Sequence, residues 1–548
     1  MIQTTRSILS MYQWRLPKTL VALLQHHNYK VIPFVRTFWH TESFSAFGDD
    51  IVYRPSRPAR LLVGIYRVGS LAQVVFAGWL LYQWYADDQT GWWAFGLAAL
   101  IVYPLVWAHI LCCMVWLGHL ARPKQLGKAI LCRILEAQVQ RLRERHHFKI
   151  VVIAGSVGKT STKAAVAKTL EASKRVLWQT GNYNDRLTVP LVFFGHTLPG
   201  LFNLPAWIRI WAHNARAIRR EYPYDVVVIE IGTDGPGQIE AFAYLKPEIV
   251  VITAITPEHM EYFGTLDAVA NEELTAMDFA EKTLINVDDT PLEYIEGREF
   301  NAYGLSPSAT YYASKRKQNG LKGQEMTVFL DKKHKFQVTV PMLGVQGAKI
   351  AVAAAATAHL LGESNEDIEK GLKTIEPFAG RMRLFEGIKK STLIDDTYNA
   401  SPIAVNAALD VLYATPAKQR VAILGSMNEL GDYSRDAHNE VGIHCDPKKL
   451  DLVVTIGADA RDYLAPVAQQ QGCRVKVFMS PYEAGSYIKK QLKKEAVVLA
   501  KGSQNGVFAE EALKELLANK NDSAEFVRQS PYWLDVKRSQ FPDTYKAF

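Results

Sequence analysis

The segment 151–162, VVIAGSVGKTST, constrains the possible folds of this chain more than any other stretch. Its apolar, β-branched first half predicts a buried strand, and its two glycines predict a tight turn into a helix. Such a turn presents backbone N–H groups to an anion, while its lysine reaches the β- and γ-phosphates and its threonine hydroxyl can bind Mg²⁺. The alternative is an ordinary strand–helix turn with a surface lysine, since two residues lie between the glycines where the common phosphate loop has four. We therefore expect a nucleoside triphosphate, ATP, to bind at Gly155, Ser156, Gly158, Lys159, Thr160 and Ser161.

Strand-like and helix-like segments alternate after this loop, which predicts an α/β domain with a largely parallel sheet. The apolar run 225–231 contains Glu230 at its end, and the run 249–255 leads into His259. Ligands bind at the carboxyl ends of such strands, so Thr160, Glu230 and His259 are candidate Mg²⁺ ligands. Lys159, Glu230 and His259 are also candidate catalytic residues. Taken singly, Glu230 or His259 would more often be structural.

Positive charge is concentrated in the first quarter of the chain. Residues 1–149 contain 17 Lys and Arg against 7 Asp and Glu, whereas the remainder contains 46 against 48. The excess adjoins long apolar runs, so we expect membrane lipid as a partner and no nucleic acid. The five cysteines show neither CxxC pairing nor metal-ligand spacing, which indicates free thiols in a reducing compartment.

Two apolar runs, 68–85 and 92–120, are each long enough to cross a bilayer as a helix. A short acidic link at 86–91 joins them, and arginines and lysines flank the pair on both sides. The positive-inside rule then predicts a two-pass hairpin in the cytoplasmic membrane, with all later domains in the cytoplasm. The alternative is a buried helical hairpin of a soluble domain.

Two more segments have amphipathic helical spacing. The first, 125–148, is expected to be a stalk helix that leads into the ATP-binding domain. The second, 204–220, is expected to place its apolar residues on one face and its arginines on another, as in a helix lying on anionic lipid. A helix packed on its own domain is an equally strong alternative. The residues expected on the apolar face are Leu204, Trp207, Ile208, Trp211, Ala215 and Ile218.

The chain resembles the Mur ligase family from about Lys149 to Leu517, because eight motifs occur in the family's order. They are GSVGKTST, GNYNDRLTVPL, VVVIEIGTDGPGQIE, TPEHMEYFG, PFAGRM, IDDTYNASP, LGSMNELGDYSRDAH and VLAKGS. The stretches DDTYNASP and GSMNELG are the specific ones, since a phosphate loop alone indicates only an NTPase. The resemblance implies a central ATPase domain and a C-terminal Rossmann-like domain. It also implies an enzyme that forms an amide bond with ATP and Mg²⁺ through an acyl phosphate.

The resemblance and the apolar runs together divide the chain into five parts. The family members that it most resembles carry a soluble domain for the UDP part of their substrate, where this chain has its hairpin. The parts are a basic, aromatic segment (1–66), the transmembrane hairpin (67–121), the amphipathic stalk helix (122–147), the central ATPase domain (148–380) and the C-terminal domain (381–548).

The resemblance also implies roles for individual residues. Asn182 and Asn184 match a segment that faces the metal and the acyl substrate. Glu429, His438 and Lys501 lie in motifs where the incoming amine is expected. Arg381, Asp396, Tyr398 and Asn399 match residues that contact the nucleotide. For His438 and Tyr398, the alternative is a purely structural role.

Glu273 stands where Mur ligases usually carry a lysine that CO₂ converts to a Mg²⁺-bridging carbamate. We expect Glu273, or Glu272, to supply that negative charge without CO₂, which makes Glu273 a further candidate catalytic residue. The alternative is a surface helix with two solvated acids.

Three functions remain open. The first is a membrane-tethered ligase of the bacterial inner membrane that adds D-Ala-D-Ala to a UDP-MurNAc-tripeptide during peptidoglycan precursor synthesis. The second is the same chemistry on a lipid-linked precursor or an envelope polymer, which the missing UDP domain favours. The third is a non-catalytic, ATP-binding scaffold. The oligomeric state is not indicated by the sequence.

Overall fold

The computed structural model describes residues 10–26, 31–41, 44, 57–87, 92–121, 123–179, 181, 183–331, 334–504 and 506–547. The chain forms two compact units, Met1–Ile130 and Leu131–Phe548. The first unit contains the apolar helices, and the second contains both sheets and the phosphate loop.

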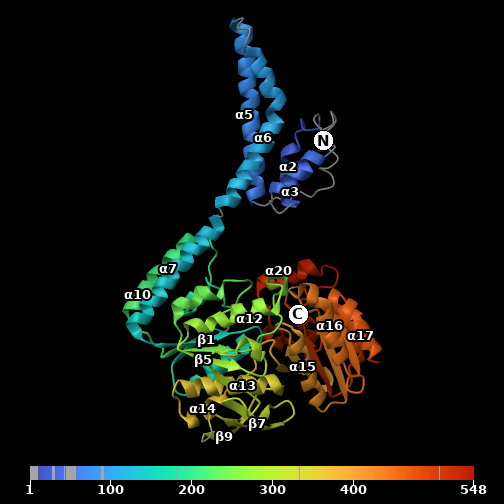
Figure 1. Ribbon diagram of the computed structural model, residues 1–548. Coiled ribbons are helices and arrows are strands. Elements are labelled where there is room, and N and C mark those ends of the chain that lie inside the picture. Colours follow the sequence, from blue (N-terminus) through green and yellow to red (C-terminus); the bar gives the residue numbers. More distant parts are fainter. Residues whose placement is uncertain are drawn as a thin grey trace. The chain divides into compact units, whose positions relative to one another are not determined.

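The first unit is built on a long helical hairpin of α5 (Arg57–Asp87) and α6 (Trp92–Ala121), which run side by side (Figure 1). Two short helices, α2 (Leu16–His26) and α3 (Val31–His40), share an apolar core with the hairpin. Residues 88–91, most of the predicted acidic link, lie outside the described residues.

The polar groups of the hairpin bond to one another between the two helices. Gln73 donates from Nε2 to the carbonyl oxygen of Ala99 (3.2 Å) and accepts from Nε1 of Trp107 (2.9 Å). Gly69 lies against the Trp107 ring, where a Cβ atom would come within 1.9 Å of it. By length and composition, Ala59–Ala86 and Trp93–Val115 could each cross a membrane, and 17% and 22% of their most apolar windows are buried.

The second unit begins within α7 (Pro123–His146), which packs against α10 (Leu204–Arg219) (Figure 1). Trp207 of α10 is 1% exposed in this contact, whereas Leu204 and Ile208 are 59% and 53% exposed. The predicted apolar residues fall within about 100° of one another around the helix, so they share one face, but only the edge of that face next to α7 is buried. The helix buries one side on its own domain and leaves an adjacent apolar stripe in solvent.

A nine-stranded sheet forms the centre of this unit, in the order β2-β3-β1-β4-β5-β6-β7-β8-β9. The strands from β2 to β7 pair in parallel, and β8 and β9 add antiparallel pairs at one edge. The strands are β1 (Lys149–Ala154), β2 (Val176–Trp178), β3 (Val226–Glu230), β4 (Ile249–Ile252), β5 (Lys282–Asn286), β6 (Asn301–Gly304), β7 (Tyr311–Gln318), β8 (Gln324–Phe329) and β9 (Lys335–Val340).

Alternate residues of β1 and β3 face opposite layers of helices, as strand geometry requires. Val151 and Val228 pack on the side of α8 (Lys159–Leu170), α13 (Gly344–Leu360) and α14 (Asn365–Leu372). The opposite side is covered by α7, α9 (Val189–Val192), η1 (Ile239–Leu245) and α12 (Leu266–Leu274).

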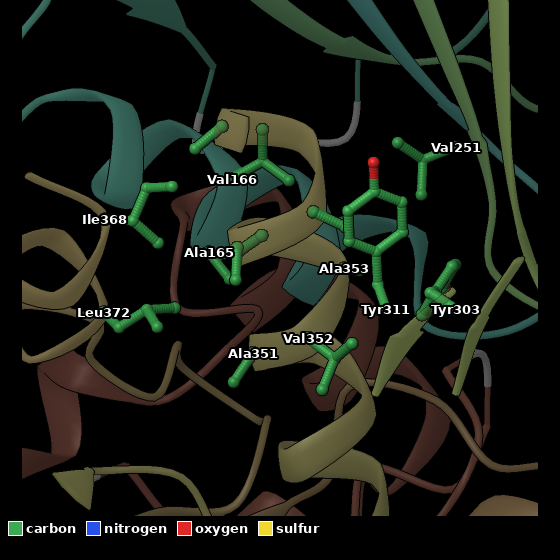
Figure 2. Packing of buried hydrophobic residues seen from close by; sticks show 14 of the residues in the cluster. Ala165, Val166, Val251, Tyr303, Tyr311, Ala351, Val352, Ala353, Ile368 and Leu372 are labelled. Atoms are coloured by element: carbon green, nitrogen blue, oxygen red, sulfur yellow. The ribbon is translucent and has the colours of Figure 1, made fainter. Parts of the chain in front are cut away.

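Helix α13 crosses the first of these layers on small side chains. Figure 2 shows Ala351 and Ala353 of this helix among Ala165, Ile368 and Tyr311, which come from α8, α14 and β7. Alanine lets helix axes approach closely without leaving voids. The phosphate loop therefore continues into a helix that is rigidly packed on both sides.

A six-stranded sheet with the order β10-β11-β15-β12-β13-β14 forms the C-terminal part, and all of its pairs except β10–β11 are parallel. Its helices are α15 (Pro402–Ala414), α16 (Ser434–His444), α17 (Ala465–Gln470), α18 (Pro481–Gln491), α19 (Glu510–Lys514) and α20 (Pro531–Gln540). Its strands are β10 (Arg383–Gly387), β11 (Ser391–Asp396), β12 (Gln419–Gly425), β13 (Leu452–Ile456), β14 (Val475–Phe478) and β15 (Ala496–Lys501). The α/β class, with a phosphate-loop domain followed by a Rossmann-like domain, is confirmed.

Helix α20 is attached to α19 by a buried cluster of charges. Nζ of Lys537 lies 2.6 Å from Oε1 of Glu511 and 3.0 Å from Oε1 of Glu510. Arg528 pairs with Glu510 at 2.7 Å. These groups are nearly inaccessible to solvent, so each charge depends on its partners.

Candidate nucleotide and metal site

The phosphate loop joins β1 to α8 with two glycines in left-handed conformations, Gly155 (φ 111°) and Gly158 (φ 91°). A Cβ atom on Gly155 would lie 2.7 Å from Oγ1 of Thr253, so this position requires glycine for space as well as for conformation. Ser156 fastens the loop to the end of β4, because its N–H donates to the oxygen of Ala254 (2.8 Å) and its Oγ accepts from the N–H of Thr256 (3.1 Å).

Lys159 is the first residue of α8, and its side chain is 12% exposed. Its ammonium group donates to the carbonyl oxygens of Gly155 and Ser156. Oε2 of Glu258 lies 3.7 Å away, and Oε1 of Glu273 lies 3.9 Å away. Burial disfavours the charge, but Glu258, Glu273 and Glu230 outweigh it and raise the pKa of Lys159. The alternative of a surface lysine at an ordinary turn is therefore wrong.

Glu230 ends β3 and is 1% exposed. It is two residues beyond Val228, so its side chain points to the same face as α8. There Oε1 accepts a 3.5 Å hydrogen bond from Oγ1 of Thr160, and Oε2 lies 3.1 Å from Nζ of Lys163. Apart from this ion pair, Oε2 has no hydrogen-bond partner. A buried carboxylate oxygen with free valence beside a hydroxyl is a donor set that fits Mg²⁺.

Lys163 is a site residue that the sequence reasoning missed. It is 1% exposed and lies one helical turn after Lys159, so both ammonium groups are on the same side of α8. The spacing of four residues in a helix that follows a phosphate loop is the signal that could have identified it.

His259 connects the central domain with the C-terminal domain. Its Nδ1 is 3.0 Å from Oε2 of Glu429, and its Nε2 is 3.4 Å from Oε1 of Glu258. These hydrogen bonds raise the pKa of His259 to about 10. The imidazole is therefore held between two carboxylates, one from each domain, and its ligation of Mg²⁺ stays a prediction. Among the described residues, no group of three or more His, Cys, Asp or Glu side chains has metal-site geometry.

Adjacent Glu272 and Glu273 are both buried, at 8% and 2% exposure, so the alternative of two solvated surface acids is wrong. Both carboxylate oxygens of Glu272 accept backbone N–H groups at the start of η1, from Gly237, Gln238 and Ile239 at 2.6–2.7 Å. Its charge is therefore used at a helix N-terminus.

Glu273 instead reaches the phosphate loop, where its Oε2 accepts a 2.8 Å hydrogen bond from the N–H of Gly155. Burial raises the pKa of Glu273, and Lys159 opposes this rise. The N–H of Gly155 was predicted to face a phosphate. In this structure that N–H donates to the carboxylate of Glu273 instead.

Two cavities meet at the loop. The larger, about 510 Å³, is lined by residues of both domains, including Asn184, Arg381, Tyr398, Asn399 and Glu429. The smaller, about 120 Å³ and mostly apolar, is lined in part by Ser161, Arg381, Asp396, Lys501 and the start of α13. Asn182 lies outside the described residues.

Arg381 lies at the junction of the two cavities. Its guanidinium carbon is 4.4 Å from the centre of the Tyr398 ring, and its Nε is buried without a hydrogen bond. A buried guanidinium nitrogen with an unused donor, on the wall of both cavities, fits an anionic ligand.

Two residues predicted to contact the amine are corrected. His438 is fully buried, and its Nε2 accepts from the N–H of Met427 (2.9 Å) while its Nδ1 bonds the oxygen of Ser434 (2.7 Å). Nε2 supports the loop before Glu429 and Nδ1 bonds the first turn of its own helix α16, which is the structural alternative. Lys501 is 1% exposed and pairs with Asp396 at 2.6 Å, so it lies with the residues of the smaller cavity.

Two family models match most of this second unit. The Mur ligase middle domain matches residues 153–358, and the Mur ligase glutamate ligase domain matches residues 380–504. Among curated proteins, the UDP-N-acetylmuramoyl-tripeptide–D-alanyl-D-alanine ligase of Synechocystis is 29% identical over 58% of this chain and 63% of that protein. The ligases of the same name from Haemophilus influenzae and Bacillus subtilis are 27% and 26% identical over 66% and 71% of this chain, and 76% and 79% of their own lengths.

Solved structures show the same fold. MurF from Acinetobacter baumannii covers 72% of this chain and 81% of its own, with a TM-score of 0.59 at 22% identity. MurF from Thermotoga maritima, in complex with ADP, covers 71% and 83%, with a TM-score of 0.57 at 20% identity. The two family models and this shared fold, together with the phosphate loop and its buried carboxylates, establish that the chain belongs to the Mur ligase family.

Proposed function

We propose that this protein is an ATP- and Mg²⁺-dependent ligase that joins D-alanyl-D-alanine to a UDP-MurNAc-tripeptide, as the names of its curated relatives state for them. The observation that carries the proposal is the convergence of Lys159, Thr160 and Glu230 on one wall of a cavity that both domains line. Arg381 on the facing domain adds a cation where the two cavities meet.

The residues at this convergence match the needs of acyl activation. Thr160 and Glu230 would hold Mg²⁺, which neutralises negative charge on a triphosphate. Lys159, with its pKa raised, keeps a positive charge available for the β- and γ-phosphates. Glu258 and Glu273 hold that ammonium group at the loop.

The reaction proceeds in two displacements. A substrate carboxylate oxygen bonds to the γ-phosphorus while the bond to the β-phosphate oxygen breaks, so ADP leaves. The amine nitrogen then attacks the acyl carbon, inorganic phosphate leaves, and the nitrogen loses a proton. Because phosphate is a better leaving group than oxide, ATP makes the carboxylate reactive. Asn184 and Glu429 face the cavity in which both substrates would meet.

Glu273 would supply the fixed negative charge at the loop without CO₂. Its carboxylate bonds the loop backbone and faces Lys159. Its charge therefore positions the ammonium group that binds the phosphates, and it is a positioning residue.

A matched pair of lysines on α8 tests the ATPase assignment. Lys159→Ala should reduce phosphate release with both substrates by more than about 100-fold, because a preorganised charge at the reacting group is lost. Lys168→Ala removes a half-exposed lysine of the same helix, which pairs with Glu171 and lies over the Trp178 ring, and should retain activity. Full activity of Lys159→Ala would refute the assignment.

The hairpin supports a second, finer proposal, that the enzyme is a two-pass protein of the bacterial inner membrane and acts beside it. Apolar side chains such as Val68, Leu71 and Phe76 point outward at 54–71% exposure, whereas Gln73 and Trp107 bond to each other between the helices. A soluble hairpin would instead bury its apolar side chains. Such a tether favours a lipid-linked acceptor as the alternative substrate.

Retention of the protein in the pellet after alkaline carbonate extraction of membranes tests this tether. Release into the supernatant would contradict it. Phosphate release with a lipid-linked acceptor, and none with the UDP-linked one, would favour the alternative substrate.

A further inference from the structure

The second unit, Leu131–Phe548, which we call the catalytic unit, exposes an apolar stripe on α10 and on the turn that precedes it. Phe202, Leu204 and Ile208 are 73%, 59% and 53% exposed. At 100° per residue, Leu204, Ile208 and Ala215 fall within about 40° of one another around the helix. We call Phe202, Leu204, Ile208 and Ala215 the outer face of α10.

The adjacent side of α10 is firmly packed, so this exposure is not a loose core. Trp207 is 1% exposed against α7. Asn214 is fully buried, where its Nδ2 donates to Oε1 of Gln138 and its Oδ1 is 2.8 Å from Nε2 of His196. These bonds fix the rotation of the helix about its axis and therefore determine which residues point outward.

A row of arginines borders the outer face. Arg209, Arg216 and Arg219 are exposed and fall within about 80° of one another around the helix, next to the apolar stripe. Within the described part of the chain, none of the ion pairs includes any of the three. Their charge is therefore available to an external anion.

The chemistry of this face selects its occupant. Large apolar side chains next to a row of arginines are typical of helices that lie in the interface of an anionic bilayer. If the hairpin spans a bilayer, the covalent link between the hairpin and the catalytic unit keeps that unit close to the same bilayer. The second candidate span ends at Val115 and the catalytic unit begins at Leu131, so fifteen residues separate them. A chain of that length reaches at most about 50 Å even when fully extended, which gives the face a high local concentration of lipid.

We propose that the outer face of α10 docks on the anionic lipid surface of the membrane that carries the hairpin. The proposal rests on the proposed membrane tether. Phe202, Leu204 and Ile208 enter the boundary between headgroups and acyl chains, and Arg209, Arg216 and Arg219 bind lipid phosphates. The catalytic unit is then held against the membrane by a second contact, besides its covalent connection.

Photo-crosslinking in the full chain tests this contact. The chain is reconstituted in vesicles of phosphatidylcholine alone or with one quarter phosphatidylglycerol, with p-benzoylphenylalanine in place of Ile208. The control carries the same group in place of Ile443, which is 63% exposed on α16. We expect position 208 to crosslink to lipid, more strongly with phosphatidylglycerol present, and position 443 to remain at background. Equal yields at both positions, or crosslinking of position 208 to a second copy of the chain, would overturn the proposal.

A charge variant separates lipid docking from simple proximity. Arg209→Gln, Arg216→Gln and Arg219→Gln together should lower the crosslinking yield at position 208 by about fivefold or more, because each arginine near an anionic surface adds attraction. Lys476→Gln, Lys490→Gln and Lys494→Gln together remove the same charge from exposed positions elsewhere in the unit and should leave the yield unchanged. An unchanged yield in the arginine variant would also overturn the proposal.

The crosslinking yield at position 208, phosphate release in detergent and carbonate extraction are separate readouts, so the possible outcomes can be told apart. Phosphate release in detergent reports whether each variant is folded. Carbonate extraction reports whether the hairpin is inserted, independently of α10. If the hairpin is inserted and position 208 stays at background, the tether stands and the docking fails.

Discussion

The amide of Gly155 donates a 2.8 Å hydrogen bond to Oε2 of Glu273, so a buried carboxylate closes one side of the phosphate loop. Glu273 comes from α12, more than a hundred residues later in the chain, and also faces Lys159. The loop is therefore positioned by a charge that the protein supplies itself.

The first prediction concerns this charge. Glu273→Gln keeps an acceptor for the Gly155 amide but removes the partner of Lys159, so kcat should fall by about 10- to 100-fold, as for other residues that position a ligand-binding group. The control is Glu299→Gln, an exposed acid of the same domain. In the unmodified enzyme, turnover in CO₂-depleted buffer should not respond to added bicarbonate. A bicarbonate-dependent rate, or a fully active Glu273→Gln enzyme, would contradict the assigned role.

The second prediction concerns the metal. Glu230→Gln leaves the shape of the side chain intact but removes its charge beside Thr160, so the Mg²⁺ concentration for half-maximal activity should rise by about 10- to 100-fold. Glu240→Gln changes an exposed acid on η1 and serves as the control. The measurement is phosphate release across a Mg²⁺ titration. A Mg²⁺ requirement that does not change in Glu230→Gln would exclude this carboxylate as a ligand.

The third prediction concerns the hairpin. Gly69→Ala should destabilise the first unit by about 1–3 kcal/mol, because its Cβ would overlap the ring of Trp107. Gly78→Ala is the matched control on the same helix, since its Cβ would have no atom within 4 Å. Thermal unfolding in detergent compares the two. Equal stability of both variants would show that α5 and α6 do not pack at Trp107.

The fourth prediction concerns the charge cluster at α19 and α20. Burial disfavours the charge on Glu510, but Arg528 and Lys537 outweigh it and lower its pKa to about 2. A lowered pKa in the folded state adds stability above the ordinary carboxyl pKa and loses it as the pH falls towards 2. The free energy of unfolding should therefore decrease between pH 4.5 and 2.

A variant of the same cluster checks the cause of this pH dependence. Lys537→Met leaves Glu510 and Glu511 buried with one cation fewer, which should cost about 3–5 kcal/mol near neutral pH. The loss should shrink in acid, because the charge interaction between Lys537 and Glu510 contributes less stability as the pH falls below the ordinary carboxyl pKa. A loss of the same size at pH 7 and pH 3 would show that the effect is packing and not charge.

Local pattern was enough to predict the phosphate loop, because strand, glycines, lysine and helix are contiguous in the sequence. It was also enough to place Glu230, since a carboxylate at the end of a buried strand meets the neighbouring loop in any parallel sheet. The family motifs extended this to Arg381 and Asp396, which the structure brings to the same cavity.

The roles that sequence reasoning missed depend on packing partners distant in the chain. Glu272 and Glu273 are adjacent, yet helix geometry turns one to η1 and the other to the phosphate loop. His438 was expected at the substrate, but the loop at Met427 uses its free nitrogen. The apolar and arginine faces of α10 were predicted from their spacing, but only the position of α7 decides that Trp207 is covered while Leu204 and Ile208 are exposed.

The most direct test of the account is product formation. Purified protein is incubated with ATP, Mg²⁺, UDP-MurNAc-tripeptide and D-alanyl-D-alanine, and mass spectrometry follows the UDP-linked product. We predict one new amide bond per ATP consumed, lost in Lys159→Ala and retained in Lys168→Ala. Tight ATP binding with no amide product from this acceptor or from a lipid-linked one would contradict the assignment of a ligase.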